Sequence, residues 1–339
     1  MTADTETKSV PEDRAVQMLE VLEAGPEKAP PAVVAAPATT AVSSPAGVVS
    51  RRLLPRATLG ILAVLFLGLA ADLLVLGEVR HHRDQLIAHA DLRESLATGE
   101  APVSQVGPDG RLLPLGTPVA FLEIPTLGLK EVIREGTTSG VLRAGPGHRR
   151  DTIMPGQIGV SVVMGRQTAF GGPFGRIKEL KAGDTLSVTT GQGRHRYKVL
   201  GVRRAGDPVP FPQERADGKK ASRLTLVTGD GAALMPTGVL RVDADLDDSG
   251  DKPSNPKLTP PKVLTTKSLP PSELAMGTDS DAWIMIVLWS QALVAAAILT
   301  AWMLRRWGKW QTWIVAVPVL AAIGMTLADE LARLLPNLL

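Results

Sequence analysis

Leu224-Thr-Leu-Val-Thr-Gly229 is the stretch that decides the fold of this chain. It belongs to a short run, 223–228, in which apolar and β-branched residues alternate, a pattern typical of a half-buried β-strand. Six more segments of this kind are separated by glycine and proline: 119–124, 129–133, 159–164, 185–189, 195–202 and 239–244. Seven short strands with turn signals between them predict a closed β-barrel or a β-sandwich.

Several further motifs surround these strands. They are Ile124-Pro-Thr-Leu-Gly-Leu129, Gly145-Pro-Gly-His148, Met154-Pro-Gly-Gln-Ile-Gly159, Gly165-Arg-Gln-Thr-Ala-Phe-Gly171, Pro173-Phe174 and Leu180-Lys-Ala-Gly-Asp184. Through them the chain resembles the sortases, membrane-anchored transpeptidases of Gram-positive bacteria, and in particular the class E type. The resemblance implies a mainly β fold, an eight-stranded sortase-like barrel with short helices over residues 117–246. The strand pattern alone does not distinguish this barrel from other all-β folds.

The resemblance also implies a catalytic cysteine, a histidine that moves the proton and an arginine that stabilises the oxyanion. The chain contains no cysteine, and Gly229 stands where the nucleophile is expected. The family pattern Gly-Asn-Val-Val-Ile-Ala-Gly-His-Arg aligns without a gap with residues 159–167, so Arg166 occupies the histidine position. Arginine stays protonated near neutral pH and cannot act as a general base. We therefore predict a degenerate family member that has lost cysteine transpeptidation.

The third catalytic position is found from the family's Arg-x-x-x-x-Ala pattern. Counting back from Ala244 places Val239 where the arginine is expected, so the vestigial catalytic positions are Arg166, Gly229 and Val239. Arg241 lies two residues further along and therefore on the same face of the strand. Positive charge at such a groove would attract a peptide carboxylate or an anionic wall polymer. The candidate ligand-binding residues are Arg166, Arg241, His148, Thr228 and Asp230.

These features predict a binding or scaffolding module for a sorting-signal-like peptide, a surface protein, an active sortase or another membrane protein. One alternative is an active peptidase or transpeptidase with a nonstandard nucleophile, Thr228 or Asp230, and with His148 or His195 as its base. The other is a structural subunit of a membrane complex.

No cofactor, metal site or nucleic-acid partner is expected. The net charge of +3 is nearly balanced, which does not favour nucleic-acid binding. Carboxylates do gather in one run, formed by Asp243, Asp245, Asp247 and Asp248. Their alternate spacing in a strand and then a linker predicts a solvated face rather than a calcium site.

Three apolar segments predict transmembrane helices at 57–79, 282–304 and 311–328. Basic residues precede the first segment and separate the second from the third, so the positive-inside rule places both of these loops in the cytoplasm. The N-terminus is then cytoplasmic, and the barrel lies outside the plasma membrane. All six tryptophans fall between Trp283 and Trp313, where they can mark the membrane interfaces. The alternative is that these segments are buried helices of a soluble protein.

The rest of the chain reads as tail, stalk and linker. Residues 1–56 are predicted to be a disordered cytoplasmic tail, and 247–281 a disordered Pro-rich linker. Residues 80–116 are predicted to be a stalk helix and linker, with Leu86, Ile87, Ala90 and Leu96 on the apolar face of the helix. Within the first span, Asp72 is expected to face the C-terminal hairpin and bond to Ser290 or Gln291. The alternative is that Asp72 reaches the outer headgroups or meets another protein.

Overall fold

The structure is a computed structural model, and it describes residues 67–204, 206–208, 222–247 and 264–339. The predicted cytoplasmic tail and the first part of the predicted first span, 57–66, lie outside the described residues. Part of the predicted Pro-rich linker, 248–263, also lies outside them.

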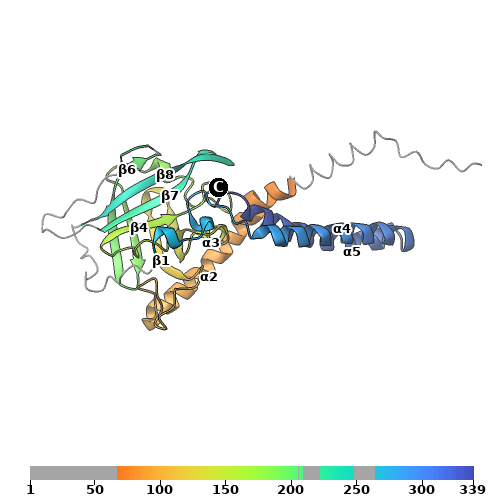
Figure 1. Cartoon of the computed structure of the whole chain (residues 1–339), viewed down its shortest axis with the longest axis horizontal. Helices are drawn as coiled ribbons and strands as arrows, with labels where there is room; N and C mark the ends of the chain where they lie inside the picture. The colour runs from red at the N-terminus through yellow and green to blue at the C-terminus, as the bar shows by residue number, and fades with distance from the viewer. Residues whose placement is uncertain (1–66, 205, 209–221, 248–263) are drawn as a thin grey trace, which may run out of the picture. The chain divides into compact units, whose positions relative to one another are not determined.

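Eight strands form a closed barrel in the order β1-β2-β3-β4-β7-β8-β6-β5 (Figure 1). They are β1 (Pro118–Ile124), β2 (Leu129–Glu135), β3 (Gly147–His148), β4 (Gly159–Met164), β5 (Thr185–Thr190), β6 (Gly193–Arg203), β7 (Ser222–Ala232) and β8 (Met235–Leu246). The pairs β2–β3 and β4–β7 are parallel, and the other six pairs are antiparallel. The predicted closed barrel and all seven predicted strands are confirmed. The eighth strand, β3, has two residues and lies where the sequence predicted only a turn.

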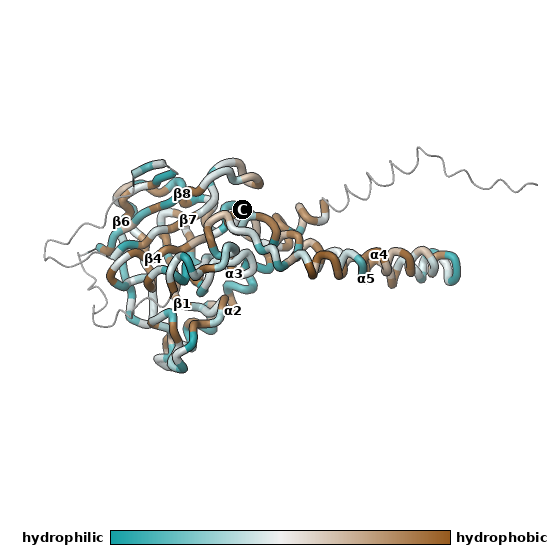
Figure 2. Tube along the Cα trace, viewed as in Figure 1, coloured by the Kyte–Doolittle hydropathy of each residue, from teal (hydrophilic) through white to brown (hydrophobic). Residues whose placement is uncertain are grey.

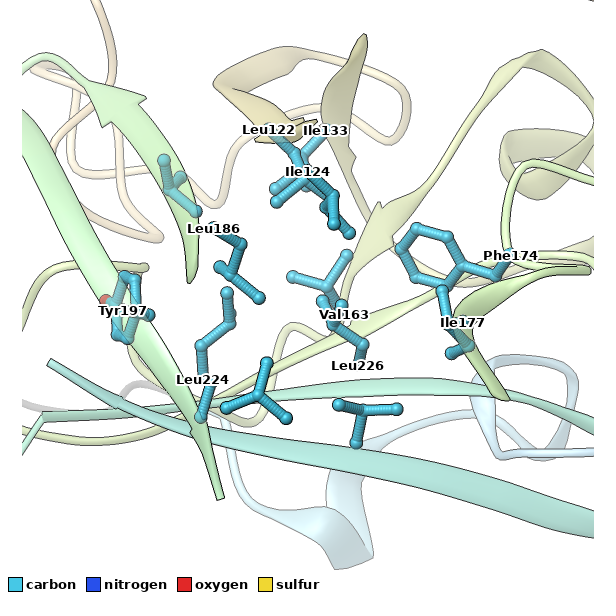
Figure 3. Close-up of a cluster of buried hydrophobic side chains, with 14 of the residues drawn as sticks. Leu122, Ile124, Ile133, Val163, Phe174, Ile177, Leu186, Tyr197, Leu224 and Leu226 are labelled. Carbon is cyan, nitrogen blue, oxygen red and sulfur yellow. The ribbon is translucent and has the colours of Figure 1, made fainter. Parts of the chain in front are cut away.

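The barrel is filled by one apolar core (Figure 3). Val163 of β4 and Leu224 and Leu226 of β7 point inward, together with aliphatic and aromatic side chains from the other side of the barrel. Burying each of these side chains contributes about 1.5 to 3 kcal/mol. Because side chains alternate along a strand, Val227 and Gly229 must lie on the outer face.

A single helical stretch crosses the predicted boundary between the first span and the stalk. The π-helical turn η1 (Asp72–Leu76) continues directly into α2 (Gly77–Thr98), which ends at Gly99 with a left-handed φ of 73°. A φ of this sign favours glycine and is a common way to end a helix. A helix is therefore present where the stalk helix was predicted, and no break separates it from the preceding turn. Its role as a stalk stays a prediction.

The apolar face predicted for this helix is partly wrong. Ala88 and Leu92 are buried against Val132 of β2, whereas Leu86 and Ile87 are exposed. The small side chain of Ala88 lets the helix lie close to the strand. Side-chain size therefore did not indicate which face of the helix is buried.

Two described helices, α4 (Ala282–Arg306) and α5 (Lys309–Arg333), are long and apolar enough to cross a membrane. They lie side by side, and Figure 2 shows them as hydrophobic over most of their length. Their most apolar windows are only 6% and 17% buried, which is unlike the core helices of a soluble domain. The predicted first span is described only from residue 67 onward, and that part supplies no third candidate. A count of three spans stays a prediction.

The described part of the predicted linker is structured, so a disordered linker does not hold for 264–281. This part contains the short 3-10 helices η5 (Thr266–Ser268) and η6 (Pro271–Glu273). Glu273 is fully buried, and its carboxylate forms an ion pair with Arg150 that includes a 2.9 Å hydrogen bond from Nε. The hydroxyl of Thr137 donates to the backbone oxygen of Glu273 at 2.6 Å.

The prediction that Asp72 bonds to Ser290 or Gln291 is wrong, because Asp72 lies beside a different residue. Asp72 is buried beside Arg80, with 3.2 Å between carboxylate and guanidinium, and Arg80 in turn contacts Asp329 of α5 at 2.5 Å. Ser290 instead donates to Val287 of its own helix. The start of the helical stretch therefore meets α5 of the hairpin and not α4.

Candidate functional site

The strands β4, β7 and β8 are neighbours in the barrel, and the three positions predicted to be vestigial catalytic ones lie on β7, on β8 and two residues beyond the end of β4. Met164 and Val227 form the last β4–β7 pair, so Arg166, two residues further on, comes level with Gly229. On the other side, Gly229 lies directly opposite Val239 in the β7–β8 register. The structure thus brings together the three positions that the sequence separates by up to 73 residues, from 166 to 239.

The outer side of these three strands forms a partly apolar surface. Met164, Val227, Leu142 and Leu338 form a buried cluster there, with Val162, Val239, Ala275 and Met276 packed against it. We call this surface the β4–β7–β8 face. It has Gly229 and Val239 near one end, and Arg241 lies opposite Val227 on the same face.

Arg166 is buried, with 1% of its surface exposed. Its Nη2 donates to the backbone oxygen of Ser139 at 3.0 Å and to the hydroxyl at 2.8 Å. The guanidinium also lies 4.9 Å from the centre of the Phe170 ring. Among the described residues, Nε and Nη1 have no hydrogen-bond partner and no carboxylate pairs with the group.

Burial without a counter-ion changes the chemistry of Arg166. Desolvation, with the nearby charge of Arg143, lowers the pKa of Arg166 to about 9. The side chain lines a pocket of about 310 Å³ together with Ser139, Phe170 and charged residues of both signs, which are Arg143, Asp279, Asp329, Glu330 and Arg333. It remains a cation near neutral pH, so it can attract an anion but cannot accept the proton that histidine would take.

Arg241 lines a second, smaller pocket, of about 120 Å³, with Arg149 and Arg203. Burial and then the charge of Arg203 lower the pKa of Arg241. Arg149 pairs with Asp151 and Arg203 with Asp243, whereas Arg241 forms no ion pair with a described residue. Its charge is therefore the least compensated of the three guanidinium groups.

His148 is fully buried and does not face the site. Its Nδ1 lies 2.8 Å from Glu135 Oε2, and its Nε2 lies 2.8 Å from the backbone oxygen of Ile153. Burial alone would lower the pKa of His148, but the charge and hydrogen bond of Glu135 outweigh it and the pKa is raised. Both ring nitrogens are occupied, so the histidine has a structural role here.

The other candidate residues are also buried or already form an ion pair. Thr228 is buried, and its hydroxyl has no hydrogen-bond partner among the described residues, so neither His148 nor His195 contacts it as a base. Asp230 pairs with Arg204 at 3.0 Å. The geometry required of a nonstandard nucleophile is therefore not assembled at these residues.

The acidic run is not a solvated face where the structure describes it. Asp243 is buried and binds both Arg203 and the hydroxyl of Thr225. Asp245 forms a two-point ion pair with Arg223. The correction arises because basic residues on neighbouring strands face these carboxylates. Across the described ranges, no group of three potential metal ligands comes together.

Sequence reasoning missed the segment Pro336–Leu339, which lies on the site. The backbone nitrogen of Gln167 donates to the oxygen of Leu338 at 3.0 Å, and that of Ala169 to the oxygen of Leu339 at 3.2 Å. A signal was present in the sequence, because leucines continue to Leu339 beyond the predicted end of the last span at 328. An apolar run outside the length of a span indicates a segment that is buried against protein.

A family model described as the sortase domain matches residues 122–233. Sortase D from Bacillus subtilis (strain 168) is 32% identical over 85 residues. The chain belongs to the sortase family. The aligned region covers 25% of this sortase-family chain and 41% of the Bacillus subtilis protein, so it spans less than half of that relative's length.

Two solved sortase structures are also similar to the chain. A mutant form of sortase E from Streptomyces avermitilis is 30% identical, covering 40% of this chain and 91% of that one, with a TM-score of 0.33. The Sortase D5 transpeptidase of Clostridium perfringens is 20% identical, covering 49% of this chain and 99% of that one, with a TM-score of 0.38. The sortase-domain match itself ends at residue 233, before α4 and α5.

Proposed function

We propose that this chain is a membrane-anchored pseudo-sortase, whose barrel lies outside the plasma membrane and acts as a binding or scaffolding module. The observation that carries the proposal is the register of β7. Gly229 lies opposite Val239 and level with Arg166, so the three positions expected to hold nucleophile, oxyanion stabiliser and proton carrier hold none of them.

The absent groups cannot be supplied by their neighbours. A covalent acyl transfer needs a nucleophilic side chain, and glycine has none. The chain contains no cysteine that a rearrangement could bring in. Arg166 is protonated near neutral pH, and the neighbouring carboxylate of Asp230 is paired with Arg204, so neither is placed to act as the general base.

The ligand is proposed to be a peptide or polymer with anionic groups. Arg241 lines a pocket without acidic residues and forms no ion pair with a described residue, whereas the pocket of Arg166 also holds Asp279, Asp329 and Glu330. Arg241 is therefore the better placed of the two to bind an anion. A buried or half-buried cation of this kind is stabilised when an anion binds next to it. Attraction of a distant anion would weaken with salt, since exposed charges are screened over about 8 Å at physiological ionic strength.

The membrane anchor is proposed to be α4 and α5, together with the span predicted at 57–79. The apolar length of the two described helices supports this arrangement. Basic residues 305, 306 and 309 between them favour a cytoplasmic turn, which leaves the barrel outside.

The test of lost transpeptidation is turnover by the full-length protein in detergent micelles. A fluorogenic Leu-Pro-Glu-Thr-Gly peptide is supplied with an amine acceptor, and an active sortase serves as the positive control. We expect cleavage no faster than in buffer. Measurable turnover would favour the alternative of an active enzyme with a nonstandard nucleophile.

The test of binding compares anionic and neutral versions of the same peptide on the wild type and on Arg241→Ala. We expect Arg241→Ala to weaken binding of the anionic version and to reduce its salt dependence. The matched control is Arg176→Ala, since Arg176 is exposed and already paired with Glu179. If partner proteins are captured equally well by a chain that lacks the barrel, the structural-subunit alternative is favoured.

A further inference from the structure

The β4–β7–β8 face is occupied by another part of the same chain. Leu338 is completely buried there in one cluster with Leu142, Met164 and Val227. Leu339 is 2% exposed and packs in a neighbouring cluster with Ala169 and Phe170. The four residues Pro336–Leu339 thus place two leucines in apolar sites on the barrel.

Main-chain hydrogen bonds hold the same segment. Gln167 and Ala169, which follow β4, donate their backbone N–H groups to the oxygens of Leu338 and Leu339 at 3.0 and 3.2 Å. Backbone hydrogen bonds combined with side chains held in pockets are a recurring feature of peptide recognition. The contact has the form of a bound peptide rather than of a loose packing contact.

Asn337 fixes the position of the segment. Its Nδ2 lies 2.8 Å from the oxygen of Thr137 and 2.9 Å from that of Leu274, with Ser272 at 3.3 Å, so three carbonyl groups face one amide. Its backbone nitrogen donates to the oxygen of Gly277 at 2.9 Å. The side chain joins the barrel, the described linker and the segment after α5.

The glycine at the vacant nucleophile position allows this close approach. A Cβ on Gly229 would lie 3.0 Å from the oxygen of Leu338 and 2.9 Å from Cβ of Pro236. Gly229 does not have a positive φ, so its backbone conformation does not itself call for glycine. The absence of a side chain is explained by the space that Leu338 and Pro236 occupy.

We propose that Pro336–Leu339 is the resident ligand of a peptide-binding surface on the β4–β7–β8 face, and that an external peptide places its apolar side chains there only by displacing this segment. The inference rests on the proposed binding function of the same face. Because only two residues separate this segment from the end of α5 at Arg333, displacement would also loosen the contact between the barrel and the hairpin.

Paired cysteines test whether the segment occupies the face in the full-length chain, which has no cysteine of its own. Val239→Cys with Leu338→Cys is oxidised in detergent micelles, and disulfide-linked peptides are measured by mass spectrometry. The matched control is Val160→Cys with Leu338→Cys. Val160 pairs with Arg223, six residues along β7 from Gly229, which places it about 20 Å away on the same face.

We expect an intramolecular disulfide in the Val239 pair at no less than ten times the yield of the Val160 pair. Equal yields in the two pairs would overturn the proposal. Disulfides formed mainly between two copies would also overturn it, since the occupant would then be a second molecule.

A labelled peptide with the sequence of residues 333–339 tests displacement. An occluding segment raises the apparent Kd of an external ligand in inverse proportion to the fraction of open sites. We therefore expect Leu338→Asp to bind the peptide about tenfold or more tightly than the wild type does. Leu200→Asp, at an exposed leucine of β6, should bind it as the wild type does.

Equal binding to Leu338→Asp and the wild type, or binding to neither, would overturn displacement. If Leu338→Asp does not fold, the disulfide yields still decide whether the segment occupies the face. Peptide turnover by the wild type would refute the loss of transpeptidation without affecting those yields. Failure of the disulfide test in an inactive protein would refute only the resident-ligand proposal.

Discussion

Gly229 and Leu338 are in contact across the vacant catalytic position, with 3.0 Å between the oxygen of Leu338 and the point where a Cβ on Gly229 would stand. The absence of a side chain at Gly229 and the placement of the segment after α5 are therefore linked by sterics. A side chain cannot be restored at position 229 without moving Leu338 or Pro236, whose Cβ would lie 2.9 Å away.

The first prediction concerns side chains at this position. Gly229→Ala should lower the free energy of unfolding by about 1 to 3 kcal/mol, because it overpacks a filled site. The matched control is Gly238→Ala, where the nearest atom to the new Cβ is 3.8 Å away and the change should stay within about 0.5 kcal/mol. Thermal unfolding of the full-length protein in detergent measures both, and equal effects would contradict the contact with Leu338.

The same position predicts how activity responds to substitution. Gly229→Cys alone should give no transpeptidation, because Arg166 leaves the site without a proton acceptor. The triple change Gly229→Cys, Arg166→His and Val239→Arg restores the expected groups, and adding Leu338→Asp should clear the face for a substrate. Peptide turnover by Gly229→Cys alone would show that Arg166 does not occupy the histidine position.

The second prediction concerns the cost of burying Arg166. Replacing a buried ion pair by apolar groups of similar volume is often neutral or stabilising by about 1 to 4 kcal/mol. Arg166 is buried with no counter-ion among the described residues to offset its desolvation. We expect Arg166→Met to raise the free energy of unfolding within this range, although it loses the two hydrogen bonds to Ser139. The exposed Arg176→Met should change little, and marked destabilisation by Arg166→Met would show that the guanidinium has a partner in solution.

Arg166 also predicts a direction of pH dependence. Its pKa of about 9 in the folded protein lies below its ordinary value of 12.5. The unfolded chain then binds more protons between these values, so this group makes stability rise as the pH increases above about 9. The difference in melting temperature between Arg166→Met and the wild type should therefore shrink between pH 8 and pH 10.

The strands could be predicted from the sequence because their side chains alternate. All seven predicted strands lie inside the observed ones. Gly229 of β7 pairs with Val239 of β8, and Arg166 follows the end of β4 by two residues. The two-residue strand β3 could not be predicted in this way, since alternation has no meaning over two residues. Its pairing depends on β2 and β4 on either side.

The contacts between residues far apart in the chain could not be predicted from the sequence. Glu273 lies in a Pro-rich stretch, which is typical of a linker, yet its buried carboxylate pairs with Arg150, 123 residues away. Leu338 follows an apolar helix and could be taken for its continuation, although it belongs to the barrel surface. Local composition cannot show which distant residue will supply a partner.

The third prediction uses the buried pair of His148 and Glu135. The pKa of His148 is raised in the folded protein, because the charge and hydrogen bond of Glu135 outweigh the effect of burial. The stabilisation is therefore fully present below the unfolded pKa of about 6.5 and is lost as the pH rises through the higher folded value. We expect His148→Gln to flatten the dependence of melting temperature on pH from 6 upward. His82→Gln, at an exposed histidine of α2, should leave that dependence unchanged.

The last prediction tests the amide of Asn337. Asn337→Ala removes a donor that faces the oxygens of Thr137 and Leu274 at 2.8 and 2.9 Å, and leaving buried carbonyl groups unpaired costs about 1 to 3 kcal/mol in total stability. Asn337→Asp keeps the shape of the side chain but turns an acceptor toward these oxygens, so it should destabilise at least as much. Hydrogen exchange should become faster in residues 264–277 of both variants, while the exchange of β1 and β2 stays as in the wild type. If Asn337→Asp retains the melting temperature and the protection of the wild type, the amide does not hold the linker and the segment on the barrel.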